Sequence, residues 1–175
     1  VGQAIVPTGT IFDGTTVGGL SSITYDAAHD VFYSLSDDQG TLAPARFYTL
    51  RIDAGDGRLD DGDVTFLDTT TLLAPDGQPY APASLDPEGL TLTKSGELIV
   101  TSEGIANRSI APWVRRYGVD GSYVADLTVP AAFVPTATGG VRQRARLGDV
   151  DVEDERHLLL GEAFEREQQE LLPRQ

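Results

Sequence analysis

The sequence is short of several residue types that many functional sites require. None of its 175 residues is cysteine, which excludes disulfide bonds, thiolate metal ligands and cysteine nucleophiles. The two histidines, His29 and His157, fall in expected turns between strands, so we predict that both are surface residues. We therefore expect no histidine-rich zinc site, and no serine–histidine hydrolase, whose Gly-x-Ser-x-Gly motif is also missing.

Positive charge is scarce as well. Thirteen basic residues stand against 27 acidic ones, which gives a formal net charge of −14 at pH 7. Such a chain repels phosphate backbones, so we predict no nucleic-acid partner and no anionic membrane surface as partner. The sequence also has no apolar run of about 18 residues that could span a membrane, and no glycine-rich phosphate-binding loop. An acidic protein attracts cations instead.

The composition of the chain suits one globular domain. Hydrophobic residues make up 40% of the chain, enough for a sizeable core at this length. We place the domain at residues 1–163 and a charged tail at 164–175, where Phe164, Leu171 and Leu172 show helical spacing and predict a short or frayed helix. The chain begins at Val1 without Met or a basic and apolar leader, as expected of a mature or trimmed protein.

Residues 86–104 read as one β-hairpin. Apolar residues alternate with other residues at 90–92 and 98–100 around a Lys-Ser-Gly turn, which is the period of a half-buried strand. Glu88 and Glu103 then stand near the same end of two paired strands and can point into one small volume. Because two close carboxylates repel each other unless a positive charge lies between them, the pattern indicates a divalent-cation site; the alternative is that both are solvated loop residues.

The same pattern occurs at least once more. Residues 18–38 repeat a Gly-Leu opening, an alternating strand, a polar turn and a second strand that ends in Ser and acid, and 147–162 form a degraded third copy. The acids at the strand ends are Asp37 and Asp38, Glu103, and Glu162. Repeats about 60 to 70 residues apart suit four-stranded propeller blades with long connections. In a propeller, repeated acids would surround a central channel.

The remaining strands support an all-β fold of antiparallel meanders. We expect strands at residues 45–53, 64–73, 113–117 and 123–129, and an edge or closing strand at 5–12 that Pro7 and Gly9 interrupt. In the strand at 45–53, Tyr48, Leu50 and Ile52 share one face. We interpret the single tryptophan, Trp113, as packing within a blade.

Residues 53–63 hold several aspartates and glycines and invite comparison with a calcium-binding loop. An EF-hand loop has glycine at its sixth position and a bidentate Glu at its twelfth. Counted from Asp53, the glycine falls one place early and no Glu closes the loop. The alternative is a turn between two strands, where Gly and Asp supply positive φ angles.

Five carboxylates form the candidate site. They are hard oxygen ligands for Ca²⁺ or Mg²⁺, and a cation held by them would polarise a phosphoryl or carbonyl oxygen while a carboxylate acts as general base. The metal ligands we predict are Asp37, Asp38, Asp86, Glu88 and Glu103. Glu103 and Glu88 are the candidate catalytic residues, and calcium is the expected ion. Arg46 is the candidate to bind the substrate's phosphate or carboxylate; its alternative role is a salt bridge to one of these acids.

Several ordered motifs resemble a known family. The bacterial phytase-like family, described as "esterase-like activity of phytase", shares motifs at Pro7–Thr10, Phe12–Thr15, Val17–Ser21, Leu35–Asp38, Pro44–Leu50, Asp86–Leu90 and Thr101–Gly104. The resemblance covers roughly residues 5 to 140. It implies a secreted or periplasmic, β-propeller-like protein that hydrolyses esters or phosphoesters, and it maps the family's carboxylate motifs onto the five acids.

The sequence departs from that family in two ways. Residues 142–149 replace the Asn-rich turn and Phe-Glu-Gly-Leu motif that family members show there, so the third repeat lacks its first Glu. A closed propeller needs at least about four blades, and 175 residues at this period supply about two to three. We expect a partial propeller. Its function is then a metal-assisted ester or phosphoester hydrolase acting on a small molecule, a non-catalytic domain that binds calcium or a partner protein, or a lactonase-type propeller.

Overall fold

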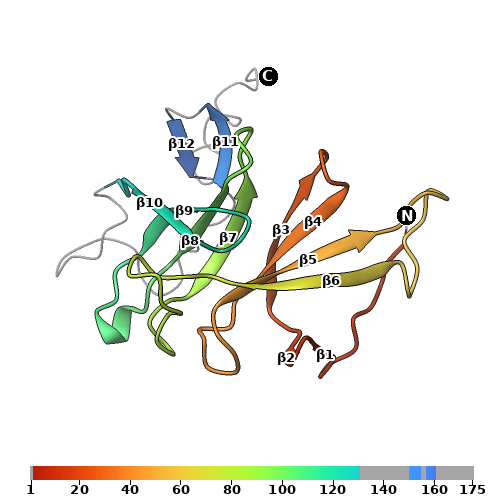
Figure 1. Ribbon diagram of the computed structural model, residues 1–175, viewed down its shortest axis with the longest axis horizontal. Helices are drawn as coiled ribbons and strands as arrows, with labels where there is room; N and C mark the ends of the chain where they lie inside the picture. Colours follow the sequence, from red (N-terminus) through yellow and green to blue (C-terminus); the bar gives the residue numbers. More distant parts are fainter. Residues whose placement is uncertain (1, 131–149, 155–156, 161–175) are drawn as a thin grey trace, which may run out of the picture.

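The computed structural model describes residues 2–130, 150–154 and 157–160, and nearly all of its regular structure is antiparallel β-sheet (Figure 1). The first large sheet contains β3 (Leu20–Asp26), β4 (Val31–Ser36), β5 (Arg46–Ile52) and β6 (Val64–Thr71) in that spatial order. The second contains β7 (Pro87–Leu92), β8 (Leu98–Ser102), β9 (Trp113–Tyr117) and β10 (Tyr123–Leu127), also as a meander. The expected all-β fold is confirmed.

The smaller elements flank these two sheets. They are β1 (Ile11–Phe12) with β2 (Thr15–Thr16), the short 3-10 helix η1 (Ala106–Arg108), and β11 (Val150–Asp154) with β12 (His157–Leu160). Pairing in the first segment starts only at Ile11, after the proline and glycine that interrupt residues 5–12. The expected tail at 164–175 and the acid Glu162 lie outside the described residues, and the domain boundary at 163 stays a prediction.

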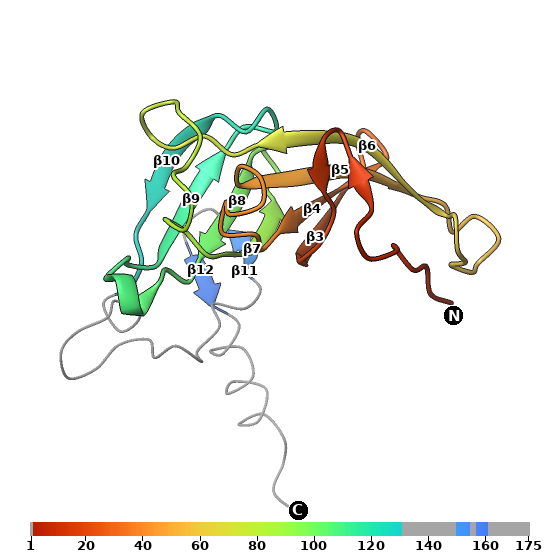
Figure 2. The same ribbon diagram turned by 90° about the horizontal axis from the view of Figure 1, so that it is seen from below.

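The first strands of successive sheets lie beside one another, as in a propeller. β3 contacts β7, and β7 contacts β11, while Figures 1 and 2 show the two large sheets forming an open stack in the described part of the chain. No helix in that part is long and apolar enough to cross a membrane.

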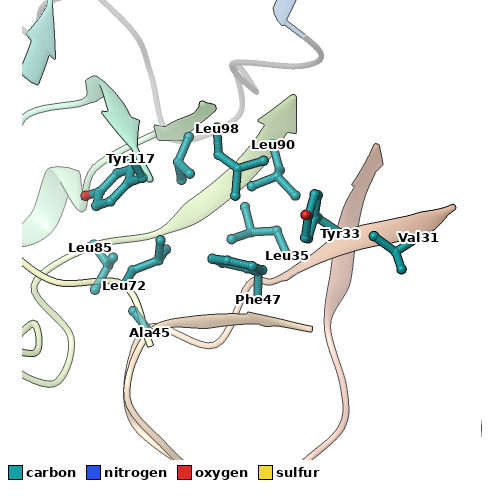
Figure 3. Packing of buried hydrophobic residues seen from close by; sticks show 11 residues of the cluster. Val31, Tyr33, Leu35, Ala45, Phe47, Leu72, Leu85, Leu90, Leu98 and Tyr117 are labelled. Atoms are coloured by element: carbon teal, nitrogen blue, oxygen red, sulfur yellow. The ribbon is translucent and has the colours of Figure 1, made fainter. Parts of the chain in front are cut away.

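The main core lies between the two large sheets. β5 shows why: its side chains alternate, so Phe47 faces the second sheet while Tyr48 and Leu50 face a smaller cluster on the outer side. Figure 3 shows side chains from both sheets meeting. The members of the main cluster are Val31, Tyr33, Leu35, Ala45, Phe47, Leu72, Leu85, Leu90, Leu98, Val100 and Tyr117. Burying each large apolar side chain stabilises the fold by roughly 1.5–3 kcal/mol, so the relative position of the sheets is set by this contact.

Two hydroxyl side chains add polar contacts at the junction. The Ser22 hydroxyl accepts a hydrogen bond from the Leu90 N–H at 3.0 Å and donates to the Leu90 carbonyl at 3.1 Å. Thr24 accepts from the Leu92 N–H at 3.2 Å. These residues satisfy backbone groups on the outer edge of β7, which would otherwise lack partners there. The end of one hairpin is thereby held against the end of the next.

The hairpins β3–β4 and β7–β8 repeat the same irregularity. Leu20 pairs with Ser36 and the register then shifts before Ser22 pairs with Leu35. In the second hairpin, Pro87 pairs with Ser102 and the register shifts before Gly89 pairs with Thr101. Asp37 and Glu103 therefore occupy equivalent positions, one residue beyond the paired strand. The structural repeat agrees with the repeat expected from the sequence.

Candidate carboxylate site

Three acids meet at one end of the second sheet. Asp86 precedes β7, Glu88 lies within it, and Glu103 follows β8. One carboxylate oxygen from each lies within 4.8 Å of the others, and all three residues are half-buried. The interpretation that the ends of this hairpin bring Glu88 and Glu103 into one small volume agrees with this geometry.

Hydrogen bonds fix the backbone beneath the three acids. The Glu103 N–H donates to the Asp86 carbonyl at 3.0 Å, which extends the pairing of the two strands by one residue. The Ser102 hydroxyl accepts from the Asp86 N–H at 2.9 Å and from the Gly104 N–H at 3.3 Å. Ser102 is completely buried. Because it ties both chain segments together, it limits how far the carboxylates can separate.

The register shift explains how two acids of β7 reach the same side. A β-bulge adds a residue to one strand, bends it and redirects side chains, and such bulges recur beside active sites. Here the shift falls between Pro87 and Gly89, so Glu88 is the extra residue. Its neighbour Gly89 has no room for a side chain, because a Cβ there would overlap the hydroxyl of Thr101.

The spacing of the three acids suits a divalent cation. Like charges about 5 Å apart repel by roughly 3 kcal/mol at an effective dielectric constant of about 20, so bringing three carboxylates together is unfavourable without compensation. Calcium binds oxygen at about 2.4 Å, and two of its ligands therefore lie up to about 4.8 Å apart. The three oxygens lie within that limit. The three carboxylates thus suit a hard divalent cation in chemistry and in separation.

Asp37 belongs to the same neighbourhood. Its N–H donates to the Gly19 carbonyl at 2.7 Å, equivalent to the bond between Glu103 and Asp86. Asp37 is exposed overall, but partial desolvation of its carboxyl raises its pKa, and the negative charges of Asp86 and Asp38 raise that pKa further. Gly19 has φ of +56° and its missing Cβ leaves space that the Asp37 carboxylate occupies. The structure thus brings Asp37 beside Asp86, although Asp37 is not one of the three grouped acids.

A cavity of about 430 Å³ joins these acids to the first sheet. The described residues that line it are Thr16, Gly18, Gly19, Asp37, Asp38, Gln39, Thr41, Leu42, Arg46 and Asp86. Asp86 is the member of the three-acid group among these lining residues, so the cavity adjoins that group. The cavity is large enough for a small ligand and lies beside the candidate metal ligands.

Asp38 plays a different part from Asp37. Its carboxylate forms a salt bridge with Arg46 at 2.9 Å, and the two side chains are only 7% and 2% exposed. It also accepts hydrogen bonds from the backbone N–H groups of Thr41, Leu42 and Ala43. Burial opposes ionisation of Asp38, but these bonds, first among them that from Arg46, lower its pKa to about 2. Asp38 organises the loop between β4 and β5.

Arg46, the candidate substrate ligand, directs its guanidinium into the protein. Nε donates to the Tyr48 hydroxyl at 2.7 Å, and the second terminal nitrogen donates to the Thr16 carbonyl at 2.8 Å. The remaining nitrogen contacts Asp38 and the Pro44 carbonyl. The salt bridge that the sequence offered as an alternative is present.

The other sequence candidates remain apart from this site. Among the described residues, the only group of three acids able to hold a metal is Asp86, Glu88 and Glu103. Asp53 and Asp63 instead accept backbone N–H groups of their own loop, at 3.0 and 2.6 Å, as turn residues do. His29 is 74% exposed in the β3–β4 turn, where it contacts Asp26.

Sequence reasoning missed the supporting residues Ser102 and Gly19. A signal existed for the first: Ser36–Asp37 and Ser102–Glu103 repeat the same Ser-acid pair at a strand end. Ser36 also binds backbone, donating to the Gly18 carbonyl at 2.9 Å. The role of Gly19 depends on where Asp37 lies, which the sequence does not specify.

Comparison with known families gives a match that covers most of this structure. The family model described as Phytase-like, "esterase-like activity of phytase", matches residues 15–150. The chain belongs to the phytase-like family. The match includes both large sheets and all five candidate acids. Comparison with curated proteins found no match, and comparison with solved structures found none either.

Proposed function

We propose that this phytase-like domain is a metal-assisted hydrolase of ester or phosphoester bonds in a small-molecule substrate. The observation that carries the proposal is the approach of Asp86, Glu88 and Glu103 to within 4.8 Å of one another, beside a cavity of about 430 Å³. Calcium is the cation that this oxygen set and spacing favour.

Asp86, Glu88 and Glu103 would hold the cation, which when bound polarises the substrate oxygen and acidifies a water molecule. Glu103, which would offer one carboxylate oxygen to the cation, accepts the proton on its other oxygen as the water oxygen attacks the ester carbon or phosphorus, with Glu88 beside it. The bond to the leaving oxygen breaks, and the same carboxylic acid returns the proton to that oxygen. Ser102 positions Asp86 through its backbone N–H. In this proposal Asp38 and Arg46 stabilise the cavity wall.

The direct test uses Glu103→Gln, which keeps the size of the side chain and removes its charge. We expect calcium to raise the melting temperature of the unmodified protein and to permit hydrolysis of a p-nitrophenyl ester or phosphate. Glu103→Gln should lower kcat by at least about 100-fold, the usual contribution of a general base, and abolish most of the calcium effect.

Glu97→Gln is the matched control. Glu97 lies at the opposite end of the same hairpin, where it makes a long contact of 3.6 Å with Arg116. The control should keep both activity and calcium response. Equal losses in the two variants, or full activity in Glu103→Gln, would refute the assignment.

A second candidate function is a non-catalytic domain that binds calcium or another protein. The outer face of the first sheet favours it, because Ile23 and Tyr25 are 52% and 47% exposed there and a second cavity of about 550 Å³ lies on that face. Stabilisation by calcium without turnover of any ester or phosphoester would support this function instead.

We also propose that the protein works in the periplasm or outside the cell. The resemblance to bacterial phytase-like proteins supports this location, and the proposed calcium site agrees with it, since weakly binding calcium modules serve extracellular proteins. The formal charge of −14 supports the absence of a nucleic-acid partner.

A further inference from the structure

The cavity beside the three acids has an unusual charge arrangement for a phosphoester hydrolase. Four charged side chains are among its described lining residues: Asp37, Asp38, Asp86 and Arg46. Arg46 is 1% exposed, and its nitrogens contact Asp38, a hydroxyl and backbone carbonyls. Its charge is therefore balanced inside the wall, and it is not presented to a ligand.

The two remaining charged groups are both carboxylates. Asp37 follows the last residue of β4 in the first sheet, Asp86 precedes the first residue of β7 in the second, and both line this one cavity. A cation held by Asp86, Glu88 and Glu103 would leave Asp37 as a further negative charge on the same wall. A phosphate monoester carries a charge of about −2 at neutral pH, so it meets like charge at this wall.

The rest of the lining suits uncharged, oxygen-rich molecules. Thr16, Gln39 and Thr41 offer hydroxyl and amide groups, and Gly18, where an added Cβ would meet nothing within 4 Å, allows close approach to the backbone. Carboxylates accept hydrogen bonds from hydroxyl groups of a ligand. Leu42, which is 77% exposed, adds an apolar surface to the lining.

We propose that this cavity selects uncharged, hydroxyl-bearing carboxylic esters or lactones and rejects phosphate monoesters. The proposal rests on the proposed function, and narrows it to carboxylic esters. The selectivity comes from Asp37 and from the withdrawal of Arg46 into its salt bridge, because discrimination between ligands is achieved by repelling the wrong one as well as by attracting the right one.

The first test compares two substrates with the same leaving group, p-nitrophenyl acetate and p-nitrophenyl phosphate, in saturating calcium. Each kcat/KM is divided by the uncatalysed rate constant of that substrate. We expect the ratio to favour the acetate by at least about 100-fold. Asp37→Asn should move that ratio at least about 10-fold toward the phosphate. The control Asp56→Asn makes the same charge change at the opposite end of the first sheet and should leave the ratio unaltered.

The second test measures binding without turnover. Glucose and glucose 6-phosphate share one polyol and differ by a phosphate, and NMR titration of the Gly18, Gly19 and Thr41 amides reports on the cavity. We expect glucose to shift these signals and glucose 6-phosphate to bind at least about 10-fold more weakly in the unmodified protein, with the difference reduced in Asp37→Asn.

The outcomes separate the two proposals. Selective binding of glucose with no hydrolysis of either ester would remove the proposed function and keep the selectivity of the cavity. Equal or tighter binding of glucose 6-phosphate, no binding of either sugar, or a normalised preference for p-nitrophenyl phosphate would overturn the selectivity, even where hydrolysis is confirmed.

Discussion

The ends of the two equivalent hairpins differ in how they treat acidic residues. Both end in Ser followed by an acid and share the same register shift. Gly19 of the first hairpin corresponds to Asp86 of the second. The carbonyl of each accepts a hydrogen bond from the N–H of the acid that follows the paired strand, which is Asp37 in the first hairpin and Glu103 in the second. Counting along from there, Ser21 of the first corresponds to Glu88 of the second. At these three equivalent positions, the first hairpin therefore has one acid, Asp37, and the second hairpin has three.

The two hairpins also differ at the residue that follows the acid. After β4, Asp38 is neutralised by Arg46 and by three backbone N–H groups. After β8, Gly104 occupies the corresponding place, with φ of +72° and no room for a side chain against the Ile110 carbonyl. The first end holds an acid in a buried ion pair, whereas the second brings three carboxylates together. Similar residue types therefore differ in role according to their partners.

The largest expected effect on stability comes from breaking the buried ion pair. Asp38→Asn leaves the Arg46 guanidinium buried without its counter-charge, which typically costs about 3–5 kcal/mol. Urea unfolding measures the loss. A decrease below about 1 kcal/mol would show that the first hairpin end does not depend on this pair.

The next effect concerns Gly19. Gly19→Ala places a side chain at φ of +56° against the Asp37 carboxylate, and we expect a loss of about 1–2 kcal/mol from backbone strain and displacement of Asp37. In a double-mutant cycle with Asp37→Ala, the part of the stability loss that comes from the clash with Asp37 should disappear, and the part that comes from backbone strain should remain. Additive losses would mean that the two residues do not interact.

Replacing the serine that precedes each acid, Ser36 or Ser102, separates an effect on stability from an effect on ion binding. Ser102→Ala and Ser36→Ala should each cost about 1 kcal/mol, the usual worth of such hydrogen bonds. Ser102→Ala alone should also weaken calcium binding, because it frees the Asp86 backbone. Isothermal titration with calcium checks this, and equal affinities in the two variants would contradict it.

The two neighbouring aspartates should respond oppositely to pH. The pKa of Asp38 is about 2 in the folded protein, below its ordinary value, so its stabilisation is present above pH 4 and is lost as pH falls toward 2. Asp37 has a raised pKa, so its stabilising contribution is present below its ordinary pKa and is lost as pH rises through the raised value. Urea unfolding from pH 2 to 7 measures both trends when the corresponding Asn variants are compared with the unmodified protein.

Asp37→Asn gives the smallest expected effect. Without calcium, it should raise stability at pH 7 by a few tenths of a kcal/mol, within the range of surface substitutions, and the gain should vanish near pH 3. A loss of stability at pH 7 would indicate that Asp37 has a favourable partner in the folded state.

Local patterns predicted much of this fold and part of the site. Alternation in residues 45–53 placed Tyr48 and Leu50 on one face, and the structure shows them together. The hairpin at 86–104 correctly placed Glu88 beside Glu103, since antiparallel pairing brings its two ends together. The sequence left two roles for Arg46 open, because a charged side chain can reach several partners and burial decides among them.

The order of apolar and polar residues along the chain was sufficient by itself to specify antiparallel hairpins, their repetition and the positions of acids at strand ends, because strand period and turn chemistry act over a few neighbouring residues. Tertiary structure alone decided that Asp37 lies beside Asp86 and that Asp38 pairs with Arg46. Those outcomes depend on how one sheet packs on another and on which charges that packing buries, and both are long-range consequences of the core.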